Sequence, residues 1–181
     1  MRGLILVRLS LMKMEIRNTV YRRPFIDLLS ELENNDTFHK IVAKDNYKRR
    51  MIYRGMMLRF FALSERSYIN YKPSIKQFCN KYLREHRNAD SQKIAELKES
   101  FKKCIDLCSY VFGDKAFRRF KAGDKSDPNG GWTVNRINMA LYDIQMCCFL
   151  NYEKNQIVPK SDEIREELMK LMIHNEEFID A

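Results

Sequence analysis

Apolar residues recur at helical spacing along almost the whole chain, and they never alternate with polar residues over a useful length. Apolar side chains that return every three or four residues lie on one face of an α-helix, whereas alternation is typical of a half-buried strand. The pattern therefore predicts an all-α fold. We expect a single domain, orthogonal or bundle-like, of about seven to nine helices.

Three helices are expected early in the chain. Proline is favoured in the first turn of a helix, so Pro24 should begin a helix that ends near the polar sequence ENND. A shorter helix should follow around Phe38. Residues 50–64 are apolar on more than one face and are predicted to form the most buried helix, in which Arg54 and Arg59 need a partner or a solvent edge.

Further helices are expected after them. Pro73 should begin one, and Asp90 or Ser91 should cap a long helix that ends at Gly113. A later helix precedes a final one that begins at Ser161. In chain order, the residues expected to be buried are Ile75, Phe78, Cys79, Tyr82 and Leu83; Ile94, Leu97, Phe101, Cys104, Ile105, Cys108, Val111 and Phe112; Ile137, Leu141, Ile144 and Cys148; and Ile164, Leu168, Leu171 and Met172.

The chain shows one obvious internal loop. Residues 121–132 are rich in charge and in turn-forming residues, so the expected organisation is a short extension at 1–10 and a helical domain at 11–181 that contains this loop. The apolar run near the N-terminus is broken by Arg8 and is too short for an export signal or a membrane span. We therefore expect a soluble, cytoplasmic protein.

Composition agrees with a folded domain, and charge points to a partner. The chain is 45% apolar and carries a formal net charge of +9. Residues 1–90 hold 19 Lys and Arg against 9 Asp and Glu, while residues 91–181 hold 14 against 15. Such asymmetry favours a polyanion facing the first half, although a solvated basic face explains it equally well. The candidate nucleic-acid-binding residues are Lys44, Lys48, Arg49, Arg50 and Arg54, which surround Tyr47 and Tyr53.

No catalytic or metal-binding set is apparent in the sequence. The five cysteines are an odd number, which favours reduced thiols. Cys104 and Cys108 are one helical turn apart, but the three histidines supply no second half-site at zinc spacing, so buried thiols are the favoured interpretation. A glycine-rich phosphate loop and a serine nucleophile turn are also lacking. We expect no metal and no cofactor, and the residues give no support for a self-contained enzyme.

The most polar short segment is MEIRNTVYRRPF, residues 14–25. Glu15, Asn18 and Arg22 share one face if the segment is helical. One interpretation is a salt-bridged surface helix. The other is a contact surface for phosphate or for another domain, since the guanidinium groups are bidentate donors and Tyr21 offers a stacking face.

Several motifs together resemble a known family. MEIRNTVYRRPF, DLLSEL, RMIYRGMMLRFFAL, YKPSIKQFCNKYL, FGDKAFRRF and NMALYDIQM occur in that order. They resemble the C-terminal helical half of the ParB-like N-terminal domain of GmrSD-type, modification-dependent restriction endonucleases, from about Leu11 onward. In that family a ParB-like core with an Asp-Gly-Gln-Gln-Arg motif precedes these helices and is linked to nucleotide hydrolysis and DNA restriction. That motif does not occur in this sequence.

The resemblance implies a role for the opening segment. It implies that the core-docking or family-motif residues are Glu15, Arg17, Asn18, Tyr21 and Arg22. We therefore expect a non-catalytic module, either a remnant or a subunit, that docks on a ParB-like core or a nuclease subunit and contacts DNA. The alternative is a free-standing nucleic-acid-binding helical protein that uses its basic N-terminal half.

Overall fold

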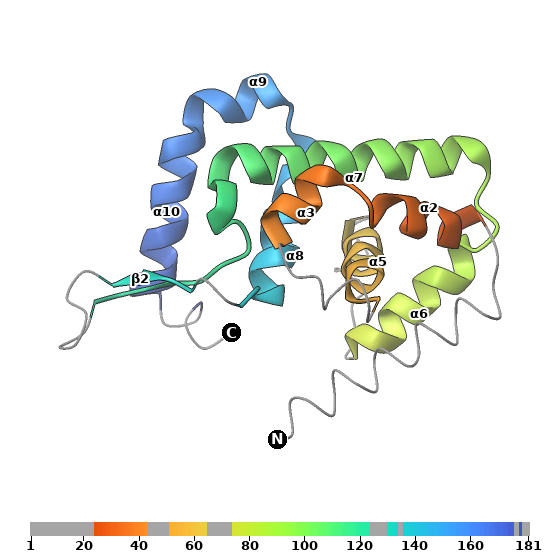
Figure 1. The fold of residues 1–181 in the computed structure, drawn as a ribbon, viewed down its shortest axis with the longest axis horizontal. Helices are drawn as coiled ribbons and strands as arrows, with labels where there is room; N and C mark the ends of the chain where they lie inside the picture. Colours follow the sequence, from red (N-terminus) through yellow and green to blue (C-terminus); the bar gives the residue numbers. More distant parts are fainter. Residues whose placement is uncertain are drawn as a thin grey trace. The chain divides into compact units, whose positions relative to one another are not determined.

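The computed structural model describes residues 24–42, 51–64, 74–123, 130–133, 136–175 and 178. The regular secondary structure of these residues is helical apart from one pair of two-residue strands, which confirms the expected all-α class (Figure 1). Of the described helices, none combines the length and apolar character that a membrane crossing requires. The α-helices are α2 (Pro24–Leu32), α3 (Asp36–Val42), α5 (Ile52–Ser64), α6 (Ile75–His86), α7 (Ser91–Phe112), α8 (Met139–Cys148), α9 (Lys154–Ile157) and α10 (Ser161–His174).

The chain divides into two compact units. Unit 1 comprises Met1–His39 and Ala43–Lys102, and unit 2 comprises Lys40–Val42 and Lys103–Ala181. The expected boundary between residues 10 and 11 lies outside the described residues.

The helix ends follow local capping chemistry. Pro24 begins α2, as expected, and the side chain of Asn35 accepts a hydrogen bond from the amide of Phe38 at 2.8 Å at the start of α3. Asp90 caps α7 in the same way, through the amide of Lys93 at 2.8 Å. Gly113 follows α7 with a φ of 54°, in the left-handed region that favours glycine. The predicted start and end of this long helix are therefore confirmed.

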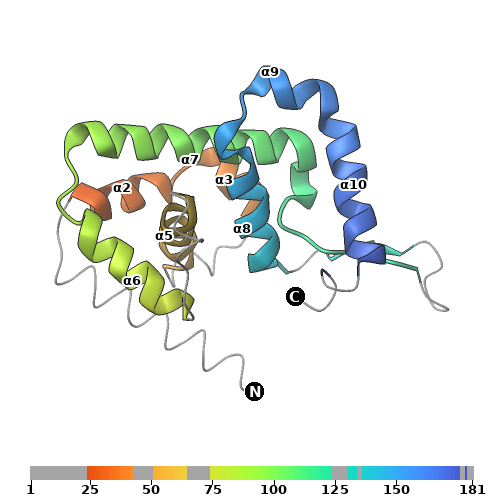
Figure 2. The same cartoon turned by 180° about the vertical axis from the view of Figure 1, so that it is seen from behind.

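The core of unit 1 is built on α5. This helix buries side chains around most of its circumference and packs against α2 and α6 (Figures 1 and 2). Phe101 of α7 lies among the rings of Phe38, Phe60 and Phe61, with centroids 5.7 to 6.1 Å away. The expectation that residues 50–64 are buried on several faces is confirmed. The buried residues of α5 are Tyr53, Met56, Met57, Leu58, Phe60, Phe61 and Ala62.

The buried face of α8 in unit 2 differs from the expected one. Leu141 is buried as predicted, but Ile144 is 41% exposed and Cys148 is also exposed, so their predicted burial is wrong. The other inward residues are instead Tyr142, Gln145 and Met146. Gln145 is 3% exposed and accepts a hydrogen bond from the amide of Phe117 at 2.9 Å. The core-facing side of α8 therefore includes a polar side chain that apolar spacing does not predict.

The final helix shows a smaller difference. It begins at Ser161 and buries Leu168 and Met172, as predicted. Leu171 is 43% exposed, so its predicted burial is wrong. The core-facing side of α10 is thus narrower than the apolar positions of the sequence suggest.

Two short strands flank the expected loop at 121–132. Strand β1 (Phe120–Lys121) pairs antiparallel with β2 (Gly131–Trp132), and the rings of Phe120 and Trp132 meet edge to face with centroids 5.3 Å apart. Gly130 has a φ of 64°, and a Cβ there would lie 2.2 Å from the carbonyl oxygen of Lys121. Strands of two residues are too short to show alternation, which explains why the sequence predicts only a loop.

Candidate functional site

Most of the sequence-predicted site residues lie outside the part of the chain that the structure describes. This applies to the expected core-docking residues Glu15, Arg17, Asn18, Tyr21 and Arg22, and to the expected nucleic-acid contacts Lys44, Lys48, Arg49 and Arg50. Among these candidates, Arg54 is the one that can be placed.

Arg54 lies in the first turn of α5 and binds the end of α2. Its Nε donates to Glu33 Oε2 at 2.7 Å, and its Nη2 donates to Glu33 Oε1 at 2.6 Å and to Ser30 Oγ at 2.8 Å. The two ionic side chains are only 15% and 11% exposed. Such a two-pronged contact uses the planar guanidinium fully. Arg54 therefore has the internal partner that the sequence required, and it joins two helices of unit 1.

Two of the described histidines, His39 and His86, also make contacts within unit 1. His39 Nε2 donates to the carbonyl oxygen of Glu33 at 2.6 Å, and its ring meets Tyr53 edge to face with centroids 5.2 Å apart. His86 Nδ1 donates to the carbonyl oxygen of Tyr82 at 3.0 Å, and the two rings stack with centroids 3.8 Å apart. Both imidazoles thus hold neighbouring backbone and rings in place.

The two cysteines one turn apart in α7 are buried. Burial raises the pKa of Cys104 to about 12 and raises the pKa of Cys108 well above its ordinary value. Cys108 Sγ lies 3.8 Å from Met146 Sδ. A metal ligand must be a thiolate, which a raised pKa disfavours. Within the described ranges, no three His, Cys, Asp or Glu side chains gather in a way that could hold a metal ion.

These thiols should differ sharply in reactivity. At about pH 8 an alkylating reagent should modify exposed Cys148 first, because buried Cys104 and Cys108 are both shielded and protonated. Burial also raises the pKa of Cys148, so its labelling should accelerate as the pH rises. Peptide mass spectrometry before and after unfolding measures these rates. Labelling of native Cys104 at the rate of Cys148 would contradict the buried placement.

Unit 2 contains a buried arginine that the sequence interpretation missed. Arg118 is 8% exposed, and it donates from Nη1 to the carbonyl oxygen of Ala116 at 3.0 Å and from Nη2 to that of Ile41 at 3.1 Å. Burial lowers its pKa. The preceding Phe117 has a φ of 63°, which is rare for a residue with a side chain. Arg118 therefore links the irregular backbone at Phe117 to the last turn of α3.

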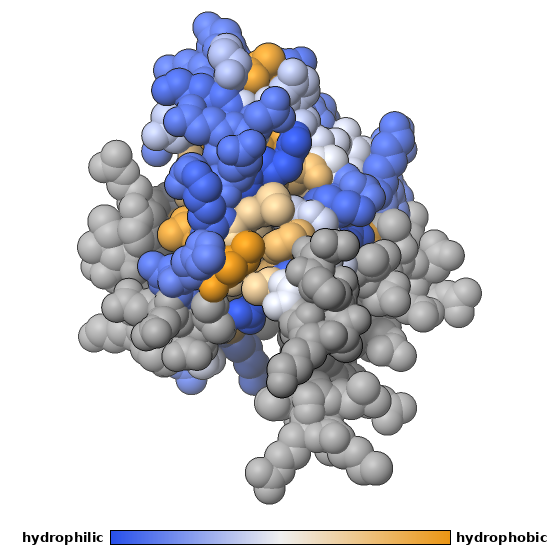
Figure 3. Space-filling view, turned by 90° about the vertical axis from the view of Figure 1, so that its left-hand side faces the viewer, coloured by the Kyte–Doolittle hydropathy of each residue, from blue (hydrophilic) through white to orange (hydrophobic). Residues whose placement is uncertain are grey.

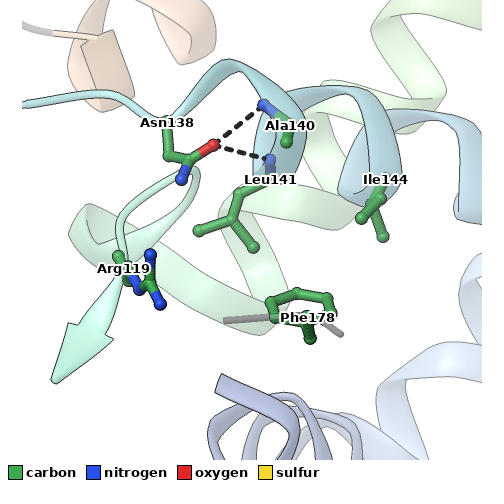
Figure 4. Close-up of a pocket in the computed structure, with 6 residues that line it drawn as sticks. All are labelled: Arg119, Asn138, Ala140, Leu141, Ile144 and Phe178. Carbon is green, nitrogen blue, oxygen red and sulfur yellow. Dashed lines mark hydrogen bonds between the residues drawn. The ribbon is translucent and has the colours of Figure 1, made fainter. Parts of the chain in front are cut away.

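A small apolar depression lies at the start of α8. Its volume is about 50 Å³, and its lining is Arg119, Asn138, Ala140, Leu141, Ile144 and Phe178 (Figure 4). Asn138 Oδ1 accepts hydrogen bonds from the amides of Ala140 and Leu141 at 2.8 and 3.2 Å. These helix N-terminal amides are therefore already engaged, and the depression offers mainly apolar contact.

A second, wider depression of about 230 Å³ lies on α7 in unit 2. Its lining is Lys103, Asp106, Leu107, Tyr110 and Lys154. Lys154 Nζ lies 5.9 Å from the ring centroid of Tyr110, and Tyr110 is 49% exposed. Lys103 is engaged by Glu153 at 3.1 Å and by the carbonyl oxygen of Leu150 at 3.0 Å. The depression is therefore of mixed charge with one aromatic wall.

Among the described residues, the large hydrophobic side chains that are exposed all lie in unit 2. The face seen in Figure 3, turned toward α10, is mainly hydrophilic with a few apolar side chains near its middle. The exposed large side chains in the described residues are Tyr110, Ile144, Tyr152 and Leu171.

The most strongly one-sided surface is the outer face of α6. One side of this helix buries Cys79, Tyr82 and Leu83. The other side, continued by the C-cap residue Arg87, carries four cations and two amides, which we call the basic face of α6: Lys76, Gln77, Asn80, Lys81, Arg84 and Arg87. The sequence analysis placed the nucleic-acid contacts upstream, at residues 44–54, and did not propose α6 as a binding surface. The helical spacing of its basic residues was nevertheless visible in the sequence.

The chain matches no protein-family model, no curated protein and no solved structure.

Proposed function

We propose that this chain is a non-catalytic helical module of a GmrSD-like restriction or antiphage-defence protein. In this proposal it docks on a ParB-like, nucleotide-hydrolysing core through the segment that contains Glu15, Arg17 and Asn18, and it also contacts DNA. The ordered motifs of the sequence support the family, and the all-α fold agrees with its helical half.

The observation that carries the proposal is the use of the chemically capable side chains as internal braces. Arg54 and Glu33 join α2 to α5, His39 and His86 bind backbone carbonyls, and Arg118 binds two more. A general acid, base or electrophile must be within hydrogen-bond reach of a substrate. Groups already held by the fold are better suited to stiffen a binding module.

The start of α2 provides a firm attachment for the docking segment. Phe25 is fully buried, and its ring lies 5.7 Å from that of Phe61 and 5.8 Å from that of Tyr82, measured between centroids. Pro24 fixes the backbone immediately before it. A partner that binds residues 15–22 would therefore be held next to the packed helices of unit 1.

Co-purification tests this docking. A ParB-like core that carries the Asp-Gly-Gln-Gln-Arg motif is expected to elute with this chain as one complex. The double variant Glu15→Lys with Arg17→Glu should abolish the complex, because it reverses the two charges to which the proposal assigns the docking. Lys160→Glu with Lys170→Glu, on exposed positions of unit 2, should leave the complex intact.

Two results would contradict the proposal. One is separate elution of the unaltered chain and core. The other is nucleotide hydrolysis by this chain alone that disappears in Arg17→Ala, since that would make the segment part of an active site.

The second candidate is a free-standing nucleic-acid-binding protein. The observation that favours it is the basic face of α6, where exposed cations cluster with amides on one side of a single helix. DNA binding by the chain alone, together with no docking on a ParB-like core, would support this candidate over the first.

A further inference from the structure

The residues of the basic face of α6 are regularly spaced along the helix. Lys76, Asn80, Arg84 and Arg87 follow one another every three or four residues and so form one stripe along the helix. Gln77 and Lys81 form a second stripe beside it. The acidic residue Glu85 lies outside these two stripes and forms an exposed ion pair with Lys81 at 3.9 Å.

Three of the four cations on this face are exposed at the surface. Lys81 has a side chain that is 68% exposed, Lys76 and Arg84 are exposed, and Arg87 is half-buried. The opposite side of the helix is fixed by packing on α5, so the face is held on a rigid element (Figures 1 and 2). A fixed row of cations binds a row of phosphates with little loss of conformational entropy.

The dimensions fit a groove. The 12 residues of α6 extend over about 18 Å, and a helix with its side chains fits the major groove of B-form DNA, which is about 12 Å wide. Cations near both ends of the helix can reach the phosphates that border the groove. The exposed amide of Gln77 can hydrogen-bond to phosphates or to base edges.

The same face fits other polyanions less well. Single strands are held by aromatic side chains on which bases stack. Of the two aromatic residues of α6, Tyr82 is buried and the half-buried Phe78 lies outside the basic face. Double-stranded RNA has a deep, narrow major groove that a helix cannot enter. We therefore infer that the basic face of α6 binds the major groove of B-form duplex DNA.

This inference rests on the nucleic-acid part of the proposed function and is independent of docking on a core. Fluorescence anisotropy of the full chain with a labelled DNA duplex of about two helical turns tests it. The duplex should bind at least tenfold more tightly than single-stranded DNA or double-stranded RNA of the same sequence, and binding should weaken steeply with salt.

The double variant Lys81→Ala with Arg84→Ala should lower the affinity by roughly tenfold and make the salt slope shallower by about two. Both residues are exposed, so the variant should fold, and circular dichroism checks this. The matched control is Lys160→Ala with Lys170→Ala, which removes the same charge from exposed positions of unit 2 and should leave the affinity unchanged.

The outcomes separate the two proposals. Duplex binding that survives unchanged in the Lys81 and Arg84 variant overturns the α6 inference but keeps a nucleic-acid-binding function. Equal binding of all the nucleic acids, or full competition by polyglutamate, shows a general polyanion surface and also overturns the inference. No binding to any nucleic acid overturns both the inference and the DNA-binding part of the proposed function.

Discussion

Replacing Glu33 with alanine is expected to lower the free energy of unfolding by roughly 3–5 kcal/mol, because it leaves the buried guanidinium of Arg54 without its carboxylate. The loss should be large because both side chains are mostly shielded from water. Urea denaturation followed by circular dichroism measures it.

Glu31, in the last turn of α2, provides a matched control for Glu33. Glu31 also pairs with a cation, Lys98 at 2.5 Å, but its side chain is 57% exposed. Glu31→Ala should therefore lower the free energy of unfolding by less than about 1 kcal/mol. Replacing Glu33 with leucine and Arg54 with methionine together should recover most of the stability, since no charge is then stranded. Equal effects of Glu31→Ala and Glu33→Ala would contradict the bracing role of Glu33.

The second large effect is expected from Phe101→Ala. This side chain is fully buried among Phe38, Phe60 and Phe61, so its removal leaves a cavity in the core of unit 1. The free energy of unfolding should fall by roughly 3–5 kcal/mol. Urea denaturation also measures this loss, through the midpoint and slope of the transition.

Tyr110→Ala on the same helix is the control for Phe101. Tyr110 is 49% exposed, so its truncation should change the free energy of unfolding by no more than about 1 kcal/mol. A loss for Phe101→Ala as small as that for Tyr110→Ala would contradict the ring cluster as the core of unit 1.

Helix positions followed from the sequence because their signals are local. Pro24, Asp90 and Gly113 act within one turn of the chain, and each was placed correctly. Which side of a helix is buried depends on contacts with the rest of the protein. In α8 the buried side includes Gln145, which accepts a hydrogen bond from the amide of Phe117, 28 residues earlier in the sequence. Apolar spacing within α8 does not reveal this contact.

The polar contacts were harder to predict for the same reason. The need of Arg54 for a partner was evident, but Glu31 and Glu33 were equally good candidates until folding buried one of them. Likewise, Arg118 and Arg119 are adjacent and chemically identical, and Arg118 is the one that is buried, at 8% exposure. Tertiary packing determines which residue of each pair is buried, and residue type alone does not predict it.

The two candidate binding surfaces differ in whether the sequence alone predicted them. The docking residues around Glu15 were proposed from motif resemblance and lie outside the described residues, so they stay a prediction. The basic face of α6 emerged only once the buried residues of that helix were known, because they define which cations share the opposite side.

Hydrogen–deuterium exchange of the full chain tests most directly whether this protein works by binding through two surfaces. We predict that a ParB-like core slows exchange in residues 11–25, and that a B-form DNA duplex slows exchange in residues 75–87. Unchanged exchange in both segments, or slowing confined to α10, would contradict this account.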